Sequence, residues 1–389
     1  MRFHRFSRLS ALLTMTTAAA LSSQGALRLA NGLEFTPIGT LLLDGAIYAS
    51  PQKEYFGDGA AIPEVRIGSV VKYDRWSAKI EIGTAYNKVA LRDLYFQYDF
   101  SDSDLIRLGA QVHHFGYMNS TAACNRTTMI ETVNNSVFNS AHIIGVQYFH
   151  TDKHIYGTAC AYVEPDATAM VIGEGGLKKM GFGLRGRLAW HPWAEEGKML
   201  QIGMSGDFTT PQHDRSEGTH EKFTYSANFP TKVDQVKAIG VTVDRARTRW
   251  QFTPELMAAY GRAGLESQYY FSQVNRLDGL PAFRAYGAYV TLRGIAIGKD
   301  YTYSRSLGGI ATPAPKTLEL VASYNYTCLS DASASLYGGR LSDLSVNANY
   351  YINRWMTARL RYGYTWIHDR TAEGPDRLGA LQARLQIIF

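Results

Sequence analysis

The chain has 389 residues, and its 40 Lys and Arg against 34 Asp and Glu leave a formal net charge of only +6, which says little about its partners. Tyrosine (25) and glycine (36) are frequent and proline (12) is scarce, a composition that favours one large β-barrel over two or three soluble domains. No apolar run of about 18 residues follows the N-terminal segment, which excludes a helical membrane span.

Residues 1–26 have the layout of a secretory signal peptide. Three arginines precede an apolar stretch that runs to Ala20, and no acidic residue occurs before Glu34. We expect cleavage between Ala20 and Ala26; an ordinary amphipathic helix is the alternative. Residues 27–389 contain no linker or low-complexity tract and are predicted to form a single β-barrel domain.

Strict alternation of apolar and polar residues recurs along the rest of the chain. Since successive side chains of a β-strand point to opposite faces, each such segment would have one apolar and one polar face. The segments are about 9 to 11 residues long, the length that crosses a bilayer at a tilt, and no helical period is sustained. The clearest, in chain order, are residues 105–115, 181–190, 316–327, 343–353, 353–367 and 378–389.

Aromatic residues lie at the ends of several apolar faces, as at Tyr98, Phe100, Tyr324 and Tyr326. Such girdles are typical of strands that cross a membrane. We therefore predict an all-β fold, a transmembrane antiparallel β-barrel of about 16 and up to 18 strands. The barrel has to close, because an open sheet edge in hydrocarbon would leave backbone groups unpaired. A soluble periplasmic barrel or sandwich is the alternative.

The connections between these segments differ in length. Residues 101–104 and 151–153 form short turns, whereas the long connections are residues 50–64, 115–141, 164–179, 209–236, 307–316 and 328–341. Short periplasmic turns that alternate with long external loops are typical of barrels in the outer membrane of Gram-negative-type bacteria. The outer membrane is therefore the predicted location, and its lipid the predicted partner of the apolar faces.

The last segment, "LGALQARLQIIF", ends on Phe389. Leu381, Ala383 and Leu385 would face lipid, with Gln382 and its alternate neighbours facing the lumen. To close the barrel, this strand should pair with the one near residues 39–49. A terminal aromatic residue after such a strand resembles the signal that the barrel-assembly machinery binds.

Basic residues on the polar faces predict an anion path along the lumen wall. Arginine suits this role because its planar guanidinium binds oxyanions bidentately and keeps its charge, and rings of basic residues make pores favour anions. Acidic residues share these faces, so individual arginines could instead be ion-pair partners. The candidate path residues are Arg66, Lys79, Arg107, Arg185, Arg187, Arg247, Arg249, Arg293, Arg359, Arg361 and Arg384.

Other functions find less support in the sequence. His113 and His114 would point to opposite faces of a strand, the three cysteines have no metal-site spacing, and no cofactor motif occurs, so we expect no metal and no cofactor. The basic residues follow the lipid and lumen alternation rather than a nucleic-acid-binding face. A barrel hydrolase would need a nucleophile and a base that meet near the rim, and no spacing singles out such a pair.

Three blocks resemble the O/P family of phosphate- and polyphosphate-selective porins. They are "FTPIGTLLLDGAIY", "LRDLYFQYDFSDSDLIRLGAQVHHFGYMNSTA", and the closing "DLSVNANYYINRWMTARLRYGYTWI" with "LQARLQIIF". The order of an Asn-rich strand, a tight Asn-Arg turn and a basic strand is the most specific feature of the three.

The resemblance implies a homotrimer of 16-stranded barrels, each with a long third loop folded inward as a constriction. Residues 115–141 occupy the position of that loop and contain one basic residue, Arg126, one acidic residue, Glu131, and no lysine. We expect a porin, not an enzyme, for passive diffusion of small hydrophilic solutes with a preference for anions, and the resemblance implies phosphate or polyphosphate among them. A general or sugar-type porin is the first alternative, and a barrel hydrolase the second.

Overall fold

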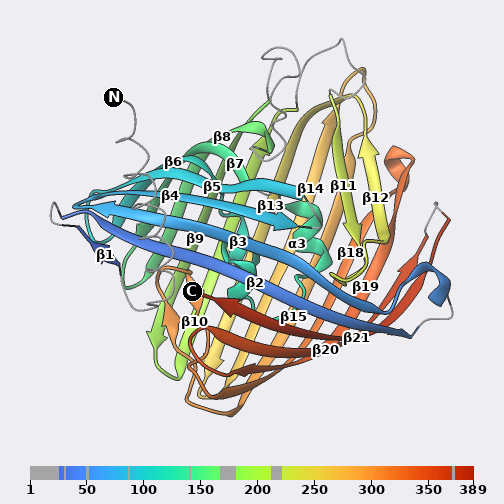
Figure 1. Cartoon of the computed structure of the whole chain (residues 1–389). Coiled ribbons are helices and arrows are strands. Elements are labelled where there is room, and N and C mark those ends of the chain that lie inside the picture. The colour runs from blue at the N-terminus through green and yellow to red at the C-terminus, as the bar shows by residue number, and fades with distance from the viewer. Residues whose placement is uncertain are drawn as a thin grey trace, which may run out of the picture.

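The computed structural model describes residues 26–29, 32–49, 52–85, 88–139, 142–166, 181–211, 221–369 and 373–389. It is a closed antiparallel barrel of sixteen strands with one short extra strand, β1 (Leu27–Arg28) (Figure 1), so the predicted fold is confirmed. The barrel strands are β2 (Glu34–Ala49), β3 (Gly59–Tyr73), β4 (Trp76–Ala85), β5 (Lys88–Asp99), β6 (Asp104–Val112), β7 (His142–Thr151), β8 (Ile155–Asp166), β9 (Phe182–Glu195), β10 (Lys198–Thr209), β13 (Ala246–Tyr260), β14 (Ala263–Arg276), β15 (Phe283–Ile297), β18 (Thr317–Asp331), β19 (Leu336–Tyr351), β20 (Met356–His368) and β21 (Arg377–Ile388). Residues 1–25 of the predicted signal peptide lie outside the described residues.

The barrel closes between its first and last long strands. β21 pairs with β2 from Thr40↔Ile388 to Ala49↔Gly379, and the backbones of Gly39 and Phe389 exchange two hydrogen bonds of 2.9 and 3.0 Å. This confirms the pairing predicted for the C-terminal segment. The faces also agree with the alternation, because Leu381 is 44% exposed on the outside and Gln382 only 1% exposed inside.

The long connection after β6 folds into the barrel, as predicted. This inner loop (residues 113–139) contains α2 (Gly116–Ser120), the 3₁₀ turn η2 (Ala123–Asn125) and α3 (Val133–Phe138), and Figure 1 shows it enclosed by strands. Its backbone N–H groups reach several wall strands: Gly116 donates to Ser205, Met118 to Gln268 and Val133 to Asn325. None of the helices in the described part of the chain is long and apolar enough to cross a membrane.

A second insertion fills the lumen beside the inner loop. The connection after β10 contains a hairpin of β11 (Phe223–Asn228) and β12 (Lys237–Val243) that packs on β19 and α3. Apolar side chains of the hairpin, the inner loop and the wall form one buried core, which includes Phe138, Tyr225, Ile239 and Leu341. Burial of these groups from water stabilises both insertions inside the barrel. This part of the lumen is therefore filled by packed side chains.

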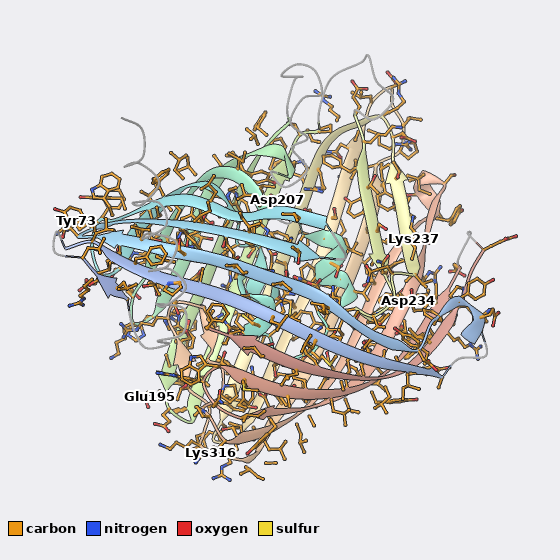
Figure 2. The ribbon with its side chains drawn as sticks, viewed as in Figure 1. Tyr73, Glu195, Asp207, Asp234, Lys237 and Lys316 are labelled. Atoms are coloured by element: carbon orange, nitrogen blue, oxygen red, sulfur yellow. The ribbon has the colours of Figure 1, made fainter. Side chains whose placement is uncertain are left out.

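A third insertion enters from the opposite end of the barrel. We predicted residues 307–316 as one of the long external loops. This assignment is wrong, because β15 and β18 are joined at the end of the barrel where short turns join β9 to β10 and β13 to β14. There the Gly197 N–H donates to the Tyr301 carbonyl and the Tyr301 N–H to the Gly261 carbonyl. This inner turn (residues 298–316) folds into the lumen through β16 (Tyr303–Ser304) and β17 (Gly309–Ile310), and Figure 2 places Glu195 and Lys316 together at this end.

Two other predicted long loops are shorter than expected. Most of residues 328–341 belong to β18 and β19, which are joined by the 3₁₀ turn η4 (Ala332–Ala334), and residues 50–64 include η1 (Lys53–Tyr55) and the start of β3. Strand pairing therefore extends beyond the segments that alternate strictly, since Thr327, Cys328 and Leu329 of β18 are all buried. Most of residues 164–179 lie outside the described residues.

Candidate functional site

A polar cavity of about 660 Å³ runs between the inner loop and the wall formed by β3 to β6. Loop residues with hydroxyl and amide side chains form one side, and charged residues of the wall form the other. Seven basic and four acidic side chains line it: Arg66, Lys79, Arg92, Arg107, Arg126, Lys232 and Arg384, with Glu64, Glu81, Asp93 and Glu131. Four of the eleven predicted path residues and both predicted loop residues are therefore brought together here.

On the wall, three bases and three acids form a balanced network. Lys79 lies 2.6 Å from Asp93, and Arg66 lies 2.6 Å from Glu64. Glu64 also faces Arg92 at 3.7 Å, and Glu81 faces Arg66 and Lys79 at 3.5 and 3.7 Å. Their side chains are only 8 to 19% exposed, so the pairs are partly shielded from water and fix the shape of the wall.

Arg92 reaches the cavity because of a β-bulge that strict alternation could not reveal. Glu81 pairs with Asp93 and Ile82 with Leu91, so Arg92 is the extra residue and both Arg92 and Asp93 point inward. Gly83 makes room for it, since a Cβ there would lie 2.9 Å from Cγ of Arg92 and 3.4 Å from Cγ of Arg66. The sequence analysis missed Arg92 for this reason, and it missed Lys232 because that residue lies on the hairpin tip.

Arg107 differs from the other cavity cations because it has no acidic partner. Its Nε donates to Gln97 at 2.7 Å, and its guanidinium lies over the rings of Tyr95 and Phe149 at 4.8 and 4.6 Å. None of the carboxylates in the described ranges forms an ion pair with it. The rings hold the side chain in place while the charge stays available to the cavity.

The two predicted loop residues form an ion pair at the mouth of the cavity. Arg126 lies 2.7 Å from Glu131, and Lys232 of the hairpin approaches the same carboxylate at 3.7 Å. Burial alone would raise the pKa of Glu131, but the two cations lower it to about 2. A second cavity, of about 240 Å³, is lined by Glu131, Lys232 and other residues of the hairpin. The mouth thus has two cations, Arg126 and Lys232, for one acid.

The structure places seven of the eleven predicted path residues away from this cavity. Four are buried in ion pairs inside the wall, Arg359 is bonded to the inner loop, Arg249 lies beside Asp207 and Thr209, and Arg247 is exposed at a bulge. The four buried pairs are Arg185–Asp207 (2.9 Å), Arg187–Glu255 (2.6 Å), Arg293–Glu319 (2.7 Å) and Arg361–Asp343 (2.8 Å).

The remaining predicted residue, Arg384, lies at the edge of the cavity but is already occupied. Nε and Nη2 of Arg384 each donate to one carboxylate oxygen of Asp44 at 2.7 Å, and Nη1 donates to the Met129 carbonyl at 2.6 Å. With Asp44 counted, five acids face seven bases around the cavity. The surplus of two positive charges consists of one on Arg107 and one from Arg126 and Lys232, which share the single acid Glu131.

Histidines and cysteines form no further site in the described part of the chain. His113 and His114 lie beyond the end of β6 rather than within a strand, and both are buried at the base of the inner loop. His114 Nδ1 is 2.7 Å from the Tyr156 hydroxyl. The described residues contain no cluster of potential metal ligands, and their three cysteines are free.

Several solved outer-membrane proteins have this fold. OmpT of Vibrio cholerae, folded in vitro and in its trimer form, has a TM-score of 0.56 and 12% identity over 92% of this chain and 99% of its own. The anion-selective porin from Comamonas acidovorans has a TM-score of 0.58 and 9% identity over 92% and 100%. The outer membrane channel DcaP of Acinetobacter baumannii has a TM-score of 0.57 and 13% identity over 94% and 100%.

The family comparison is more specific than these structural likenesses. No curated protein sequence matches the chain. The family described as phosphate-selective porin O and P matches residues 53–389, which covers most of the chain and confirms the resemblance read from its motifs. The family and the fold indicate a channel rather than an enzyme. The chain therefore belongs to the phosphate-selective porin O and P family and is an outer-membrane porin.

Proposed function

We propose that this porin passes small anions in preference to cations, by passive diffusion along the cavity between the inner loop and β3 to β6. The surplus of two positive charges around that cavity is the observation that carries the proposal. Low-dielectric walls extend the influence of such charges on ions in the pore. Both the family and the Comamonas porin of similar fold are consistent with this preference.

The solute path then uses Arg126 and Lys232 at the mouth and Arg107 further inside. A permeating ion has to leave as well as enter, so separated weak sites serve better than one deep site. The balanced network of Arg66, Lys79 and Arg92 lies between them and would guide an anion without trapping it. Arg384 is shielded by Asp44 and contributes less.

Reversal potentials in a KCl gradient across a planar bilayer test this proposal. An anion-selective pore is expected, and a cation-selective pore would contradict it. A general or sugar-type porin is the second candidate, because the three wall bases are matched by three acids. That candidate predicts a reversal potential near zero.

Phosphate is the proposed preferred solute among the anions, on the ground of the family alone. Inorganic phosphate added to KCl should reduce the chloride current if the pore binds it. The inner loop contributes no lysine, so Arg107 and Arg126, with Lys232 of the hairpin, are the donors for this binding. Equal currents with and without phosphate would restrict the function to general anion diffusion.

We further propose a homotrimer, since a solved outer membrane protein of similar fold is described in a trimer form. Phe389 would bind the barrel-assembly machinery during insertion, and it is 54% exposed beside Gly39 at the barrel seam. The mature domain would follow a signal peptide of residues 1–26, and the protein would catalyse no reaction. Cross-linking in the native membrane and N-terminal sequencing of the mature chain check the first and third points.

A further inference from the structure

Each of the three segments inside the barrel is held to the wall in the same way. One backbone carbonyl of the segment accepts two hydrogen bonds, one from an arginine and one from a glutamine on neighbouring strands. The pairs are Arg359 with Gln386 on Cys124 of the inner loop, Arg361 with Gln382 on Pro230 of the hairpin tip, and Arg187 with Gln201 on Gly308 of the inner turn.

The geometry of these three clamps is closely similar. All six donor to acceptor distances lie between 2.9 and 3.2 Å. A carbonyl oxygen has two lone pairs, so it can accept both bonds at once. The six donor side chains are all buried, which strengthens such bonds and makes an unpaired carbonyl costly.

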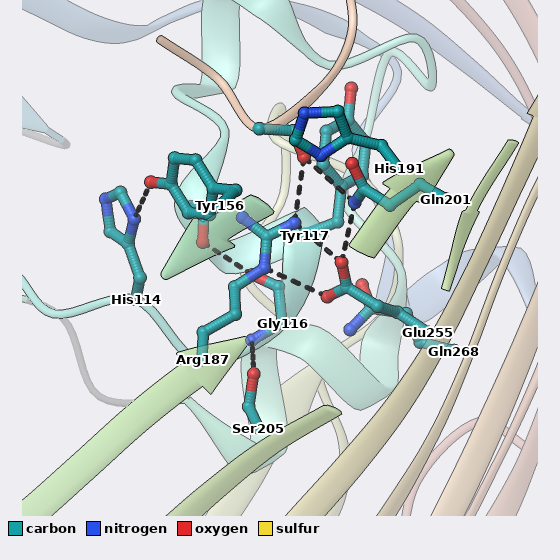
Figure 3. Close-up of polar contacts among 12 residues, drawn as sticks. His114, Gly116, Tyr117, Tyr156, Arg187, His191, Gln201, Ser205, Glu255 and Gln268 are labelled. Carbon is teal, nitrogen blue, oxygen red and sulfur yellow. Dashed lines mark hydrogen bonds and ion pairs between the residues drawn. The ribbon is translucent and has the colours of Figure 1, made fainter. Parts of the chain in front are cut away.

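Two of the clamp arginines are themselves held by a carboxylate of the wall. Arg361 is bonded to Asp343, and Arg187 is bonded to both oxygens of Glu255 (Figure 3). Arg359 lacks an acidic partner in the described chain and instead gives a second nitrogen to the Arg126 carbonyl at 2.7 Å. The guanidinium fork thus joins the strands of the wall to the loop.

The clamp on Gly308 shows how tightly one segment is fitted. Gly308 has a positive φ of +59°, and a Cβ on it would lie 2.8 Å from the Tyr156 ring. The Tyr117 hydroxyl of the inner loop donates to the Ile310 carbonyl at 3.1 Å, so the inner turn and the inner loop meet inside the barrel. Tyr117 and Ile310 also belong to one buried apolar cluster with Tyr301, so the two segments pack together inside the barrel.

We propose that the three Arg–Gln clamps are positioning devices that set the cross-section of the pore by holding the inner loop, the hairpin tip and the inner turn against the wall. The clamp residues then act on permeation through the segments they hold and lie off the ion path. The inference does not depend on anion preference. The two roles predict opposite changes in the single-channel current. Release of a clamped segment widens the pore and raises the current, whereas loss of a cation on the ion path lowers the anion current.

The clamp on Cys124 also fixes the residue at the mouth of the cavity. Arg359 holds the carbonyls of both Cys124 and Arg126, so the side chain of Arg126 is directed toward Glu131. Arg359 is therefore a positioning residue for Arg126. Its loss should disturb the mouth as well as the loop.

Glutamine substitutions test the clamps without leaving a buried carboxylate unpaired. Gln201→Leu, Gln382→Leu and Gln386→Leu each remove one of the two bonds to a clamped carbonyl. Gln147→Leu is the matched control, because Gln147 is also buried in the wall and its amide has no partner among the described residues. Single-channel recording in planar bilayers, with polyethylene glycols of increasing size as probes of width, gives the readout.

In the clamp variants, we expect larger and noisier open states and entry of larger polymers. For Gln382→Leu and Gln386→Leu, loss of the bond to the clamped carbonyl should raise the population of released states about fivefold, which corresponds to about 1 kcal/mol. Gln201→Leu also removes the bonds of Gln201 to Glu255 and from the Tyr303 hydroxyl of the inner turn, so its effect should be larger. The control should record like the wild type. Unchanged noise and polymer cut-off in all three clamp variants would overturn the proposal.

Arg359→Gln separates the two roles most directly, because no carboxylate is left without a partner. A wider and noisier pore supports the clamp, and Arg359→Lys should restore part of the wild-type behaviour by bonding one carbonyl. A quiet pore of unchanged width with reduced anion permeability would assign Arg359 to the ion path and contradict the inference. Migration of the heated and unheated barrel on gels checks that every variant has folded.

Discussion

At the scale of single residues, the same kind of side chain has two fates on the lumen face. Arg185 is paired with a carboxylate and fully buried, whereas Arg107 lies between two rings and has no acidic partner. The difference arises from the neighbouring strand: Arg185 faces Asp207 across β9 and β10, and Arg107 faces Gln97 across β5 and β6. Parity places a residue on the lumen face, but whether its charge is free depends on the acids within reach. Asp207 lies directly opposite Arg185, whereas the partner of Arg187 is Glu255, which lies one strand further on in β13.

Arg107→Gln is predicted to lower the permeability of chloride relative to potassium. A unit charge about 4 Å away contributes roughly 1 kcal/mol in water, so the permeability ratio should fall by about fivefold at low salt. The reversal potential in a KCl gradient measures this change. Arg262→Gln serves as a control, because Arg262 is exposed at a short turn outside the cavity. An equal shift in both variants would contradict the assignment of Arg107 to the path.

Glu131 provides a pH test of the cavity mouth. Its pKa is lowered to about 2 from an ordinary value of 4.5, so its ion pair with Arg126 adds stability that is fully present above pH 4.5 and is lost as the pH falls through about 2. Between pH 7 and pH 4, the charge of Glu131 should therefore stay constant, and the contribution of the mouth to selectivity should not change. Glu131→Gln should raise anion selectivity at every pH in that range. The prediction would be contradicted if the wild-type selectivity changed between pH 7 and pH 4 and this change were absent in Glu131→Gln. That result would show that the carboxylate of Glu131 becomes protonated in this range.

At the scale of elements, the sequence could specify the strands because their alternation is set by lipid on one side and water on the other. β21 with its exposed Leu381 and buried Gln382 is the clearest case. The inner turn was misplaced because alternation gives no sign of which end of the barrel a connection occupies. The hairpin core was missed because Leu341 and similar residues face the lumen near the loop end, where an insertion takes the place of water.

The bulge in β5 could not be predicted from the sequence, because one extra residue moves Arg92 to the lumen face without any change in composition that would indicate it. Gly83→Ala tests the space that this bulge requires. The new Cβ would lie 2.9 Å from Cγ of Arg92, so the arginine should move toward the cavity and reduce single-channel conductance while the net charge stays the same. Gly206→Ala is the control, because nothing lies within 4 Å of a Cβ at that position. A wild-type conductance in Gly83→Ala would mean that Arg92 can retreat without narrowing the path.

At the scale of the whole molecule, packed side chains fill one side of the barrel lumen, and the polar cavity lies on the other side. The core of the hairpin and the inner loop, together with the inner turn, occupies the lumen beside the later strands. The polar cavity is left beside β3 to β6. The position of the pore is therefore set by which insertions pack together, and the charge of the pore by the wall that they leave uncovered.

Thiol labelling distinguishes an off-centre path from a central one. Ser136 is exposed and lines both cavities, whereas Ser323 is 3% exposed on the wall of β18. In a Cys124→Ser background, which removes the native cavity thiol, a negatively charged methanethiosulfonate should reduce the current through Ser136→Cys and leave that through Ser323→Cys unchanged. Because the mouth carries a surplus of positive charge, the negatively charged reagent should react faster than a positively charged one. Block of Ser323→Cys at a similar rate would mean that water and ions reach the far wall, and that the insertions do not close that side of the lumen.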